Sequence, residues 1–277
     1  MLKGRFQQFV LLLRQGDKME AALRNIKKNI LKMVHYSHSS HVGAALSVVD
    51  ILYTIYSRVA NISKSNIASE DRDRVILSKG HSSAALYSVL AEFGMLDSEY
   101  LKRYYVDGGI LPGHLDLTVS PAIDCSSGSL GHGLSIGIGM ALARPQNRVF
   151  VIMGDGELNE GSVWEGIIFA GKRKIKNLTL IVDFNKLQGC AYSQDIADYS
   201  KLTETLGNFG LDSRRIDGHN LDEIENALKK RSNSSLAIVA DTIKGKDVSY
   251  MQGQLKWHYK SPNDDELAMA LEELDRL

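Results

Sequence analysis

Apolar residues recur at three- and four-residue steps from Met19 onward, which predicts an amphipathic helix. The positions are Met19, Leu23, Ile26, Ile30, Met33 and Val34. Residues 1–18 precede this pattern and are expected to form a loosely attached lead-in. Residues 44–57 are apolar almost all round, as in a helix that is buried on every side. Residues 82–93 and 97–105 predict two more helices, separated by Gly94.

Three short runs rich in β-branched residues predict strands that are covered on both faces: 149–153 (VFVIM), 178–182 (LTLIV) and 236–243 (LAIVADTI). Such runs are typical of a parallel sheet flanked by helices. Helices are expected between and after them, at 162–174, 221–231 and 264–277, the last capped by Asn263. The alternation predicts an α/β fold with a doubly wound, mostly parallel sheet, as a single domain over residues 19–277.

The charge balance excludes several kinds of partner. The 277 residues include 33 Lys+Arg and 33 Asp+Glu, so the formal net charge is 33 − 33 = 0. This balance gives no electrostatic footprint for nucleic acid or for an anionic membrane, and neither is expected as a partner. The apolar stretch at 9–13 is too short for a membrane span or a signal-peptide core. Cys125 and Cys190 form no disulfide framework and lack zinc-site spacing, so a cytoplasmic location is expected.

A candidate site for a cation and a phosphate follows the first two predicted strands. Gly154, Asp155 and Gly156 come at the end of one strand, and Asn185 follows the next strand, 185 − 155 = 30 residues later. The carboxyl ends of adjacent parallel strands meet at one sheet edge, where open α/β sheets bind ligands. The Asp155 carboxylate, the Asn185 amide oxygen and a backbone carbonyl near Leu187 suit Mg²⁺ that also bridges a diphosphate. Taken alone, a glycine-flanked aspartate is more often an ordinary turn residue.

Histidines are the candidate proton carriers, because imidazole is best poised for proton transfer near neutral pH. Five of them lie in segments rich in Gly or Ser: His41, His81, His114, His132 and His258. A single such histidine is more often a surface or capping residue, and His219 in I-D-G-H-N is interpreted as a turn residue. A zinc site on His35, His38 and His41 is disfavoured, because no carboxylate or cysteine completes it.

Seven motifs, in order, resemble the amino-terminal, diphosphate-binding half of the transketolase family. They are S-K-G-H-S-S (78–83), L-P-G-H (111–114), G-S-L-G-H-G-L-S-I-G-I-G-M-A-L-A (128–143), G-D-G-E-L-N-E-G (154–161), N-K-L-Q (185–188), I-D-G-H (216–219) and K-G-K-D-V-S-Y-M…W-H (244–258). The resemblance runs from about Met19 to the end of the chain. It implies a subunit that binds thiamine diphosphate and a divalent cation: Mg²⁺, Ca²⁺ or Mn²⁺.

The resemblance also implies roles for individual residues. The expected cofactor contacts are His81, Gly128, Ser129, Leu130, Gly156, Asn185 and His258. The expected metal ligands are Asp155, Asn185 and the carbonyl of Leu187. His41, His114 and His258 are expected to face the sugar and to move protons to and from its hydroxyls. Glu160 matches a family glutamate near the subunit interface.

Several positions depart from the family pattern, close to where cofactor and sugar are expected. Ser40 and Val42 flank His41 where the family has glycine and proline, and His132 replaces a glutamine. Gly189-Cys190-Ala191 stands where an Asp-Gly is frequent. These changes bear on the substrate more than on the fold, so an atypical sugar remains open.

The pyrimidine-binding domain, which carries the family's catalytic glutamate, does not follow in this sequence. We expect a split transketolase: this chain, with a separate subunit that supplies the second domain, two copies of each. Such a complex would transfer a two-carbon ketol unit from a ketose or ketose-phosphate donor to an aldose acceptor. The alternatives are a truncated chain, a non-catalytic cofactor-binding module, a deoxyxylulose-phosphate synthase fragment and the α-subunit of a 2-oxo-acid dehydrogenase.

Overall fold

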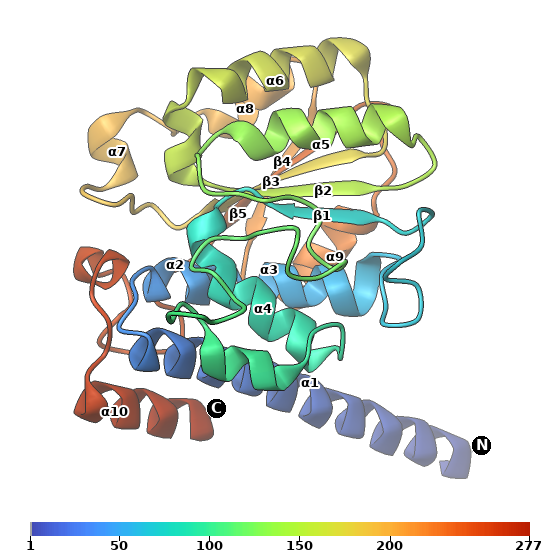
Figure 1. Ribbon diagram of the computed structural model, residues 1–277. Coiled ribbons are helices and arrows are strands. Elements are labelled where there is room, and N and C mark those ends of the chain that lie inside the picture. Colours follow the sequence, from blue (N-terminus) through green and yellow to red (C-terminus); the bar gives the residue numbers. More distant parts are fainter. Residues whose placement is uncertain (1) are drawn as a thin grey trace.

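Five parallel strands lie between two layers of helices (Figure 1). This computed structural model describes the backbone of residues 2–277 and the side chains from residue 16 onward. The strand order is β1-β2-β3-β5-β4, and each neighbouring pair is parallel. The predicted fold class, a mostly parallel α/β sheet flanked by helices, is confirmed.

The strands are β1 (Arg74–Leu77), β2 (Val149–Gly154), β3 (Leu178–Phe184), β4 (Asp212–Asp217) and β5 (Leu236–Asp241). The α-helices are α1 (Leu2–Tyr36), α2 (Val42–Ser47), α3 (Val49–Thr54), α4 (Ser83–Glu92), α5 (His132–Ala143), α6 (Gly161–Arg173), α7 (Ser193–Ile196), α8 (Leu202–Asn208), α9 (Leu221–Lys229) and α10 (Asp264–Asp275). Short 3₁₀ helices occupy Gly80–Ser82, Ser98–Arg103, Asp155–Asn159 and Leu255–His258, and a π-helical turn occupies Ile55–Val59.

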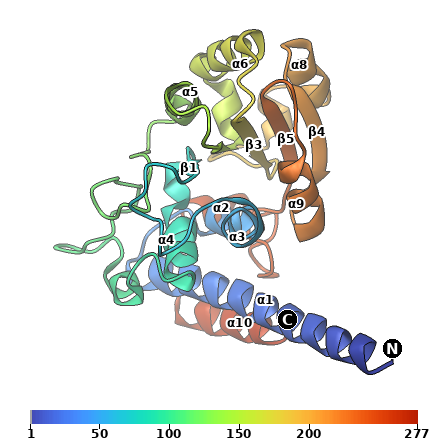
Figure 2. The ribbon, with the colours of Figure 1, turned by 90° about the vertical axis from the view of Figure 1, so that its right-hand side faces the viewer.

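Side chains alternate between two cores, one on each face of the sheet. In β2, Phe150 and Ile152 join the core beneath α1 to α4 and α9, whereas Val149 and Val151 join the core beneath α5, α6 and α8. Figures 1 and 2 show these helix groups on opposite sides of the strands. The two-residue period of a strand therefore accounts for continuous apolar runs that face a core on both sides.

The three predicted strands are present, but β1, β4 and α5 were not predicted. β1 has only four residues, and β4 (DSRRID) is a polar edge strand with no buried residue. Polar edge strands lack the apolar signal that marks central ones. Glycines weaken the helical signal of α5, yet a Cβ at Gly137 would lie 2.4 Å from Val151 Cγ2. Glycine is needed there because the helix packs so closely on the sheet.

The first helix begins at Leu2, earlier than the predicted start at Met19. Its residues Ile26, Ile30 and Val34 are buried, as the periodicity predicted. The predicted helix at 44–57 is instead divided among α2, α3 and the π-helical turn. The segment Val42–Val59 is long and apolar enough to cross a membrane, with a mean hydropathy of 1.3, but 83% of it is buried inside the protein. It is a central core element of this fold.

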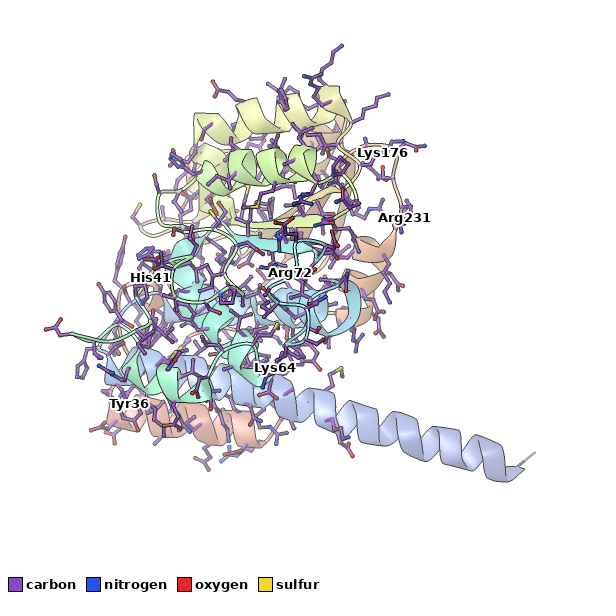
Figure 3. The ribbon with its side chains drawn as sticks, turned by 45° about the vertical axis from the view of Figure 1, so that its right-hand side comes forward. Tyr36, His41, Lys64, Arg72, Lys176 and Arg231 are labelled. Carbon is purple, nitrogen blue, oxygen red and sulfur yellow. The ribbon has the colours of Figure 1, made fainter. Side chains whose placement is uncertain are left out.

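Because the strands are parallel, their carboxyl ends lie together on one side of the sheet, the carboxyl edge, and their amino ends lie together on the opposite side, the amino edge. The two edges differ in chemistry. Figure 3 shows His41 at one end of the molecule, and Lys176 and Arg231 at the other. His41 lines a cavity at the carboxyl ends of the strands, whereas Lys176 comes just before β3 and Arg231 precedes β5.

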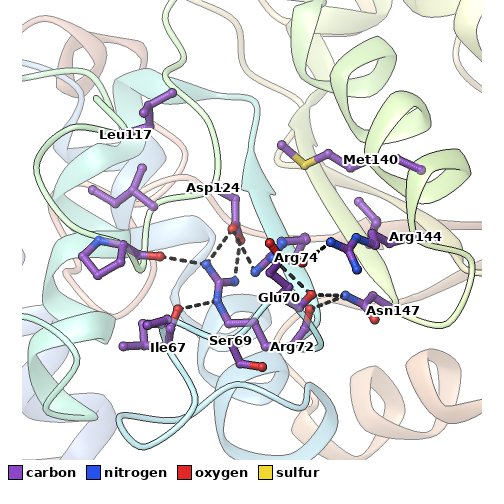
Figure 4. Close-up of a pocket in the computed structure, with 15 residues that line it drawn as sticks. Ile67, Ser69, Glu70, Arg72, Arg74, Leu117, Asp124, Met140, Arg144 and Asn147 are labelled. Carbon is purple, nitrogen blue, oxygen red and sulfur yellow. Dashed lines mark hydrogen bonds and ion pairs between the residues drawn. The ribbon is translucent and has the colours of Figure 1, made fainter.

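Arg72, in the segment before β1, forms an ion pair with Asp124, in the loop before Gly128 (Figure 4). Its Nη1 and Nη2 donate to the two Asp124 carboxylate oxygens at 3.1 and 2.7 Å, and Nε donates to the Ile67 carbonyl at 2.8 Å. The two side chains are 4% and 5% exposed. A buried guanidinium with these partners needs no further ligand.

We predict that Arg72→Ala lowers the free energy of unfolding by about 3 kcal/mol, because the buried Asp124 loses its two close hydrogen bonds from Arg72 and keeps only Arg74, at 3.7 Å, as a counter-ion. Arg144→Ala is the matched control. It breaks a pair with Glu70 in which both side chains are largely exposed, so its cost is below about 1 kcal/mol. Urea unfolding measures both, and equal losses would contradict the role given to Arg72.

Candidate active site

The carboxyl ends of β2 and β3 open into a cavity of about 410 Å³. Gly154 pairs with Asp183 in the register of the two strands, which brings Asp155 and Asn185 to the same edge. The predicted site residues that line the cavity are His41, His81, His114, Gly128, Leu130, Asp155, Gly156, Glu160, Asn185, Leu187 and His258. Ser129 is exposed and is not among the lining residues. The structure therefore gathers residues far apart in the sequence at one place.

The other four histidines, His35, His38, His132 and His219, lie outside this cavity. His132 is the exposed first residue of α5, and its Nδ1 contacts the Leu130 carbonyl at 3.2 Å. His219 lies in a turn, as expected, but its ring joins Asp50 at 2.6 Å to the backbone N–H of Ile243 at 2.9 Å. His35 contacts the Pro262 carbonyl at 2.8 Å. Among the described residues no group of three His, Cys, Asp or Glu side chains is placed to hold a metal, which disfavours the zinc alternative further.

Three residues with oxygen donors, Asp155, Asn185 and Leu187, line the cavity. The Asp155 carboxylate accepts hydrogen bonds from the Ser193 hydroxyl at 2.7 Å and from the Gly156 N–H at 3.0 Å. Burial raises the pKa of this carboxyl to about 6, and Ser193 and two lysines limit the rise. Asn185 Oδ1 accepts from the Leu187 N–H at 3.1 Å, which places the Leu187 carbonyl in the same turn. A carboxylate, an amide oxygen and a carbonyl form an all-oxygen donor set, as hard cations require.

A buried ion pair lies beneath these oxygens. Lys79 Nζ donates to Asp183, whose side chain is 0% exposed, and also to the Ala44 carbonyl at 3.0 Å. Burial alone would raise the pKa of Asp183, but Lys79 and the hydroxyls of Thr242 and Ser47 outweigh it and hold the pKa below its usual value. The carboxylate therefore stays ionised and keeps the lysine in place.

A second buried lysine lies beside the Leu187 turn. Lys244 Nζ donates to the Leu187 and Gln188 carbonyls at 3.2 and 3.3 Å and to His258 Nδ1 at 2.9 Å. Burial and the charge of Lys79 lower its pKa to about 8, so the ammonium remains mostly protonated at neutral pH. The Gln188 side-chain nitrogen, on the cavity wall, is buried with no hydrogen-bond partner in the described structure. Donors without acceptors and clustered ammonium groups suit an oxygen-rich anion.

Four histidines surround the cavity. The His41 ring centroid lies 4.9 Å from that of His258, 5.1 Å from that of His81 and 5.9 Å from that of His114. Burial, followed by neighbouring positive charges, lowers the pKa of His41 to about 4 and that of His258 to about 3. Burial also lowers the pKa of His81 and of His114. All four imidazoles are consequently neutral at pH 7.

The contact with Lys244 fixes which His258 nitrogen carries the proton. An ammonium group can only donate hydrogen bonds, so His258 Nδ1 accepts from Lys244 and the ring hydrogen resides on Nε2. His258 thus presents an N–H donor near Gly189, because a Cβ at that glycine would lie 3.4 Å from Nε2. A hydrogen-bond acceptor on a ligand is the natural partner of this group.

His41 adopts a left-handed backbone conformation, with φ 73° and ψ 14°, at the start of α2. Non-glycine residues in this region are uncommon and concentrate at functional sites. The His41 N–H donates to the His258 carbonyl at 2.7 Å, and its Nδ1 lies 3.1 Å from the Ser40 hydroxyl. Ser40, one of the departures from the family pattern, therefore touches the ring of a cavity histidine.

Glu157 holds the turn at Gly128–Gly131 against the end of β2. It accepts hydrogen bonds from the Ser78 hydroxyl at 2.5 Å, the Gly131 N–H at 2.9 Å and the Gly154 N–H at 3.0 Å. Gly131 has φ 82°, and a Cβ on it would lie 2.7 Å from that of Glu160. Sequence reasoning gave no role to Glu157, Lys79, Asp183 or Lys244, although three of them lie within the quoted motifs and Asp183 lies near the end of β3.

This edge of the sheet defines a class of protein: an α/β domain whose cavity, lined by ammonium groups and neutral histidines, suits an anionic, phosphate-bearing ligand. Residues 19–275 match the family described as "Transketolase, thiamine diphosphate binding domain". The chain belongs to the transketolase family.

Two relatives match the chain nearly end to end. It is 34% identical to an apulose-4-phosphate transketolase subunit of Actinobacillus succinogenes, over 93% of this chain and 96% of that protein. It is 37% identical to the 6-deoxy-6-sulfo-D-fructose transketolase subunit SqwG of Clostridium sp. (strain MSTE9), over 91% and 94%. These relatives mark the chain as part of a transketolase-type enzyme.

Longer transketolases match over part of their length. Human transketolase is 32% identical over 80% of this chain but 36% of its own. The Pichia stipitis transketolase in complex with sedoheptulose-7-phosphate superposes with a TM-score of 0.87 at 25% identity, over 93% of this chain and 40% of that one. The Campylobacter jejuni transketolase gives a TM-score of 0.81 at 27% identity, over 93% and 42%. The chain thus spans about 40% of the length of these solved transketolases.

We predict that His258 contributes to acid unfolding. Its pKa is about 3 in the folded chain against a usual 6.5, so the unfolded chain binds the proton more tightly. Stability is therefore full above pH 6.5 and falls as the pH drops toward 3, by about 1 kcal/mol at pH 5 from this group alone once solvent screening of the partly exposed ring is allowed for. His258→Asn should reduce the loss of stability between pH 8 and pH 5 by that amount. His132→Asn, at an exposed position, is the control; identical pH profiles for the two variants would contradict the assignment.

Proposed function

We propose that the chain binds thiamine diphosphate and Mg²⁺ and acts as one half of a split transketolase. With a separate partner subunit it would transfer a two-carbon ketol unit from a ketose or ketose-phosphate donor to an aldose acceptor. The observation that carries this proposal is the end-to-end match to proteins named as transketolase subunits, combined with a match to only 36% of a single-chain transketolase. A non-catalytic module, or the α-subunit of a 2-oxo-acid dehydrogenase, would explain these matches less well.

The residues at the carboxyl edge fit a cation-bound diphosphate. Asp155, Asn185 and the Leu187 carbonyl supply oxygen ligands for Mg²⁺, or for Ca²⁺ or Mn²⁺ in its place. Lys244 and the Gln188 side-chain nitrogen, which has no hydrogen-bond partner in the described structure, line the same cavity and suit phosphate oxygens. The proposed remaining cofactor contacts are His81, Gly128, Ser129, Leu130, Gly156 and His258. The bound cofactor supplies the electron sink that carbon–carbon bond cleavage requires.

In this proposal the histidines form hydrogen bonds with the sugar hydroxyls and exchange protons with them. Neutral His41 and His114 accept or donate hydrogen bonds as the substrate demands, because burial keeps the pKa of each below its usual value. His258 donates through Nε2–H, and Lys244 holds that tautomer. A sugar alkoxide that forms near His258 would be stabilised by this N–H and by the ammonium behind it. Proton transfer then proceeds between positioned groups within the cavity.

The substrate we propose is an unusual ketose. The two end-to-end relatives are named for apulose-4-phosphate and for 6-deoxy-6-sulfo-D-fructose. Gly189, which departs from the family pattern, lines the cavity beside His258, and Ser40, a second departure, contacts the ring of the cavity residue His41. Changes at these positions alter how a sugar is held without altering the fold.

The partner we propose carries the pyrimidine-binding domain and its glutamate, in a cytoplasmic complex with two copies of each chain. Exposed apolar side chains support an assembly: Ile136 and Leu142 on α5, and Ile168 and Phe169 on α6, are 38–49% exposed. Glu160 lies on the exposed rim of the cavity, where a neighbouring subunit would reach it. A cofactor shared between two chains makes the complex obligatory for turnover.

We predict that the purified chain alone shows no ketol transfer, and that activity appears on adding the partner recovered with it from its native cell. Turnover should require a divalent cation and be lost on chelation with EDTA. The measurement is formation of the new ketose, with and without the partner, at saturating thiamine diphosphate. Robust activity of the chain alone would refute the split-enzyme proposal. A partnered complex that binds cofactor but stays inactive would favour the non-catalytic alternative.

We predict that His258→Asn lowers kcat of the reconstituted complex by about 10²-fold or more, because a positioned proton carrier is lost. His132→Asn, outside the cavity, should change kcat less than twofold. Steady-state kinetics on both complexes, with cofactor binding measured in parallel, separates a catalytic loss from a binding loss. Unchanged turnover of the His258 variant would exclude the proposed role.

A further inference from the structure

A second, larger cavity lies at the opposite, amino-terminal edge of the sheet. Its volume is about 750 Å³, against about 410 Å³ for the carboxyl-edge cavity. It is formed where α5, α6 and α9 end and where the chain enters β2, β3 and β5. Lys176 and Arg231, labelled in Figure 3, come from two of these turns. None of the groups proposed for ketol transfer lines this cavity.

Seven of its lining residues are cationic and none is acidic. Arg173, Lys174 and Lys176 come from the turn between α6 and β3, Lys229, Lys230 and Arg231 from the end of α9, and Arg148 from just before β2. The whole chain has a formal net charge of zero, so this is a strong local excess. Among the described side chains, only Lys229 in this set has an ion pair, with Glu225.

Helix ends explain a small part of this charge. Cations are favoured at helix C-termini, and each terminus carries roughly half a negative charge. Three C-termini, those of α5, α6 and α9, therefore offset roughly 1.5 positive charges, while six cations have no carboxylate partner in the described structure. Several positive charges remain for a ligand to neutralise.

Arg148 forms part of the cavity wall, and its pKa reflects the excess of positive charge. Its guanidinium lies 4.5 Å from the Phe150 ring centroid and donates to the Leu228 carbonyl. Burial lowers the pKa of Arg148, Asp73 opposes the shift, and the charge of Arg231 lowers the pKa further. Lys176 has one weak contact, to Asn233 Oδ1 at 3.4 Å. Positive charges thus lie near one another in this cavity, and several of their N–H donors have no acceptor in the described structure.

The arginine-lined cavity in Figure 4 shows what a purely structural cluster looks like. It has a volume of about 390 Å³, and its three arginines are each within ion-pair distance of a carboxylate: Arg72 and Arg74 of Asp124, and Arg144 of Glu70. Among the described side chains, Lys229 is the one cation of the amino-edge cavity that has a carboxylate partner, and the other six have none. Internal ion pairing therefore does not account for its cations.

We propose that the amino-edge cavity binds a small anion bearing several phosphate groups, at a site separate from the carboxyl edge. Guanidinium and ammonium donors together match phosphate oxygens, and the volume is that of a small-molecule site. No aromatic side chain is among the described residues that line the cavity, so it offers no stacking surface for a nucleobase. The phosphate groups, and not a base, are what it recognises.

The test uses the full-length chain and inorganic tripolyphosphate as the probe, in metal-free buffer at about 150 mM salt, where exposed charges are largely screened beyond a Debye length. Calorimetry compares the wild type with Lys176→Gln/Arg231→Gln and with the control Lys64→Gln/Lys102→Gln, which removes two exposed cations elsewhere. We expect the first variant to weaken binding at least tenfold and the control to change it less than twofold. Backbone amide signals should shift in residues 146–148, 173–177 and 229–233.

Three results would overturn the proposal. Amide shifts confined to residues 154–156 and 185–189 would assign the binding to the carboxyl edge. Equal affinity of the wild type and the Lys176/Arg231 variant, with both folded by circular dichroism, would remove the cavity from the binding. Tighter binding of a hexaglutamate peptide than of tripolyphosphate would identify the surface as a docking site for an acidic protein segment.

Discussion

The candidate site depends on one buried ion pair, between Lys79 and Asp183. The carboxylate belongs to the end of β3, the lysine follows β1, and hydroxyls of Ser47 on α2 and Thr242 after β5 complete the set of hydrogen bonds. Because neither charge has access to water, loss of either partner would leave the other unpaired, at a cost of about 3–5 kcal/mol. Four segments that line or support the cavity are thereby held in one arrangement before any ligand arrives.

This pair also sets the electrostatics above it. Asp183 compensates Lys79, but Lys244 has only carbonyls and a histidine as direct partners. Burial, reinforced by the charges of Lys244 and Lys79, discourages protonation of His41 and His258, so these histidines remain neutral. A site built in this way keeps imidazoles ready to exchange protons at neutral pH.

The sequence predicted the centre of this site better than its support. Asp155 and Asn185 could be placed together because each follows an apolar strand, and strand ends in a parallel sheet share an edge. Lys79, Lys244 and Glu157 could not be assigned, since a buried charge shows no periodicity and its partner lies far away in the sequence. The same limit applies to His219, which looks like a turn residue yet joins Asp50 to the end of β5. Strand β4 escaped prediction because its side chains are polar, and α5 because its glycines serve close packing.

The hydrogen bond from the His41 N–H to the His258 carbonyl joins the beginning of the chain to its last quarter. Strands β1, β2 and β3 are complete by Phe184, and can pair while synthesis continues. The wall that contains Lys244 and His258, however, exists only once those residues have left the ribosome. A nascent chain can therefore form most of its sheet while its cofactor cavity still lacks one side. The cavity is therefore complete only after the last quarter of the chain has been synthesised.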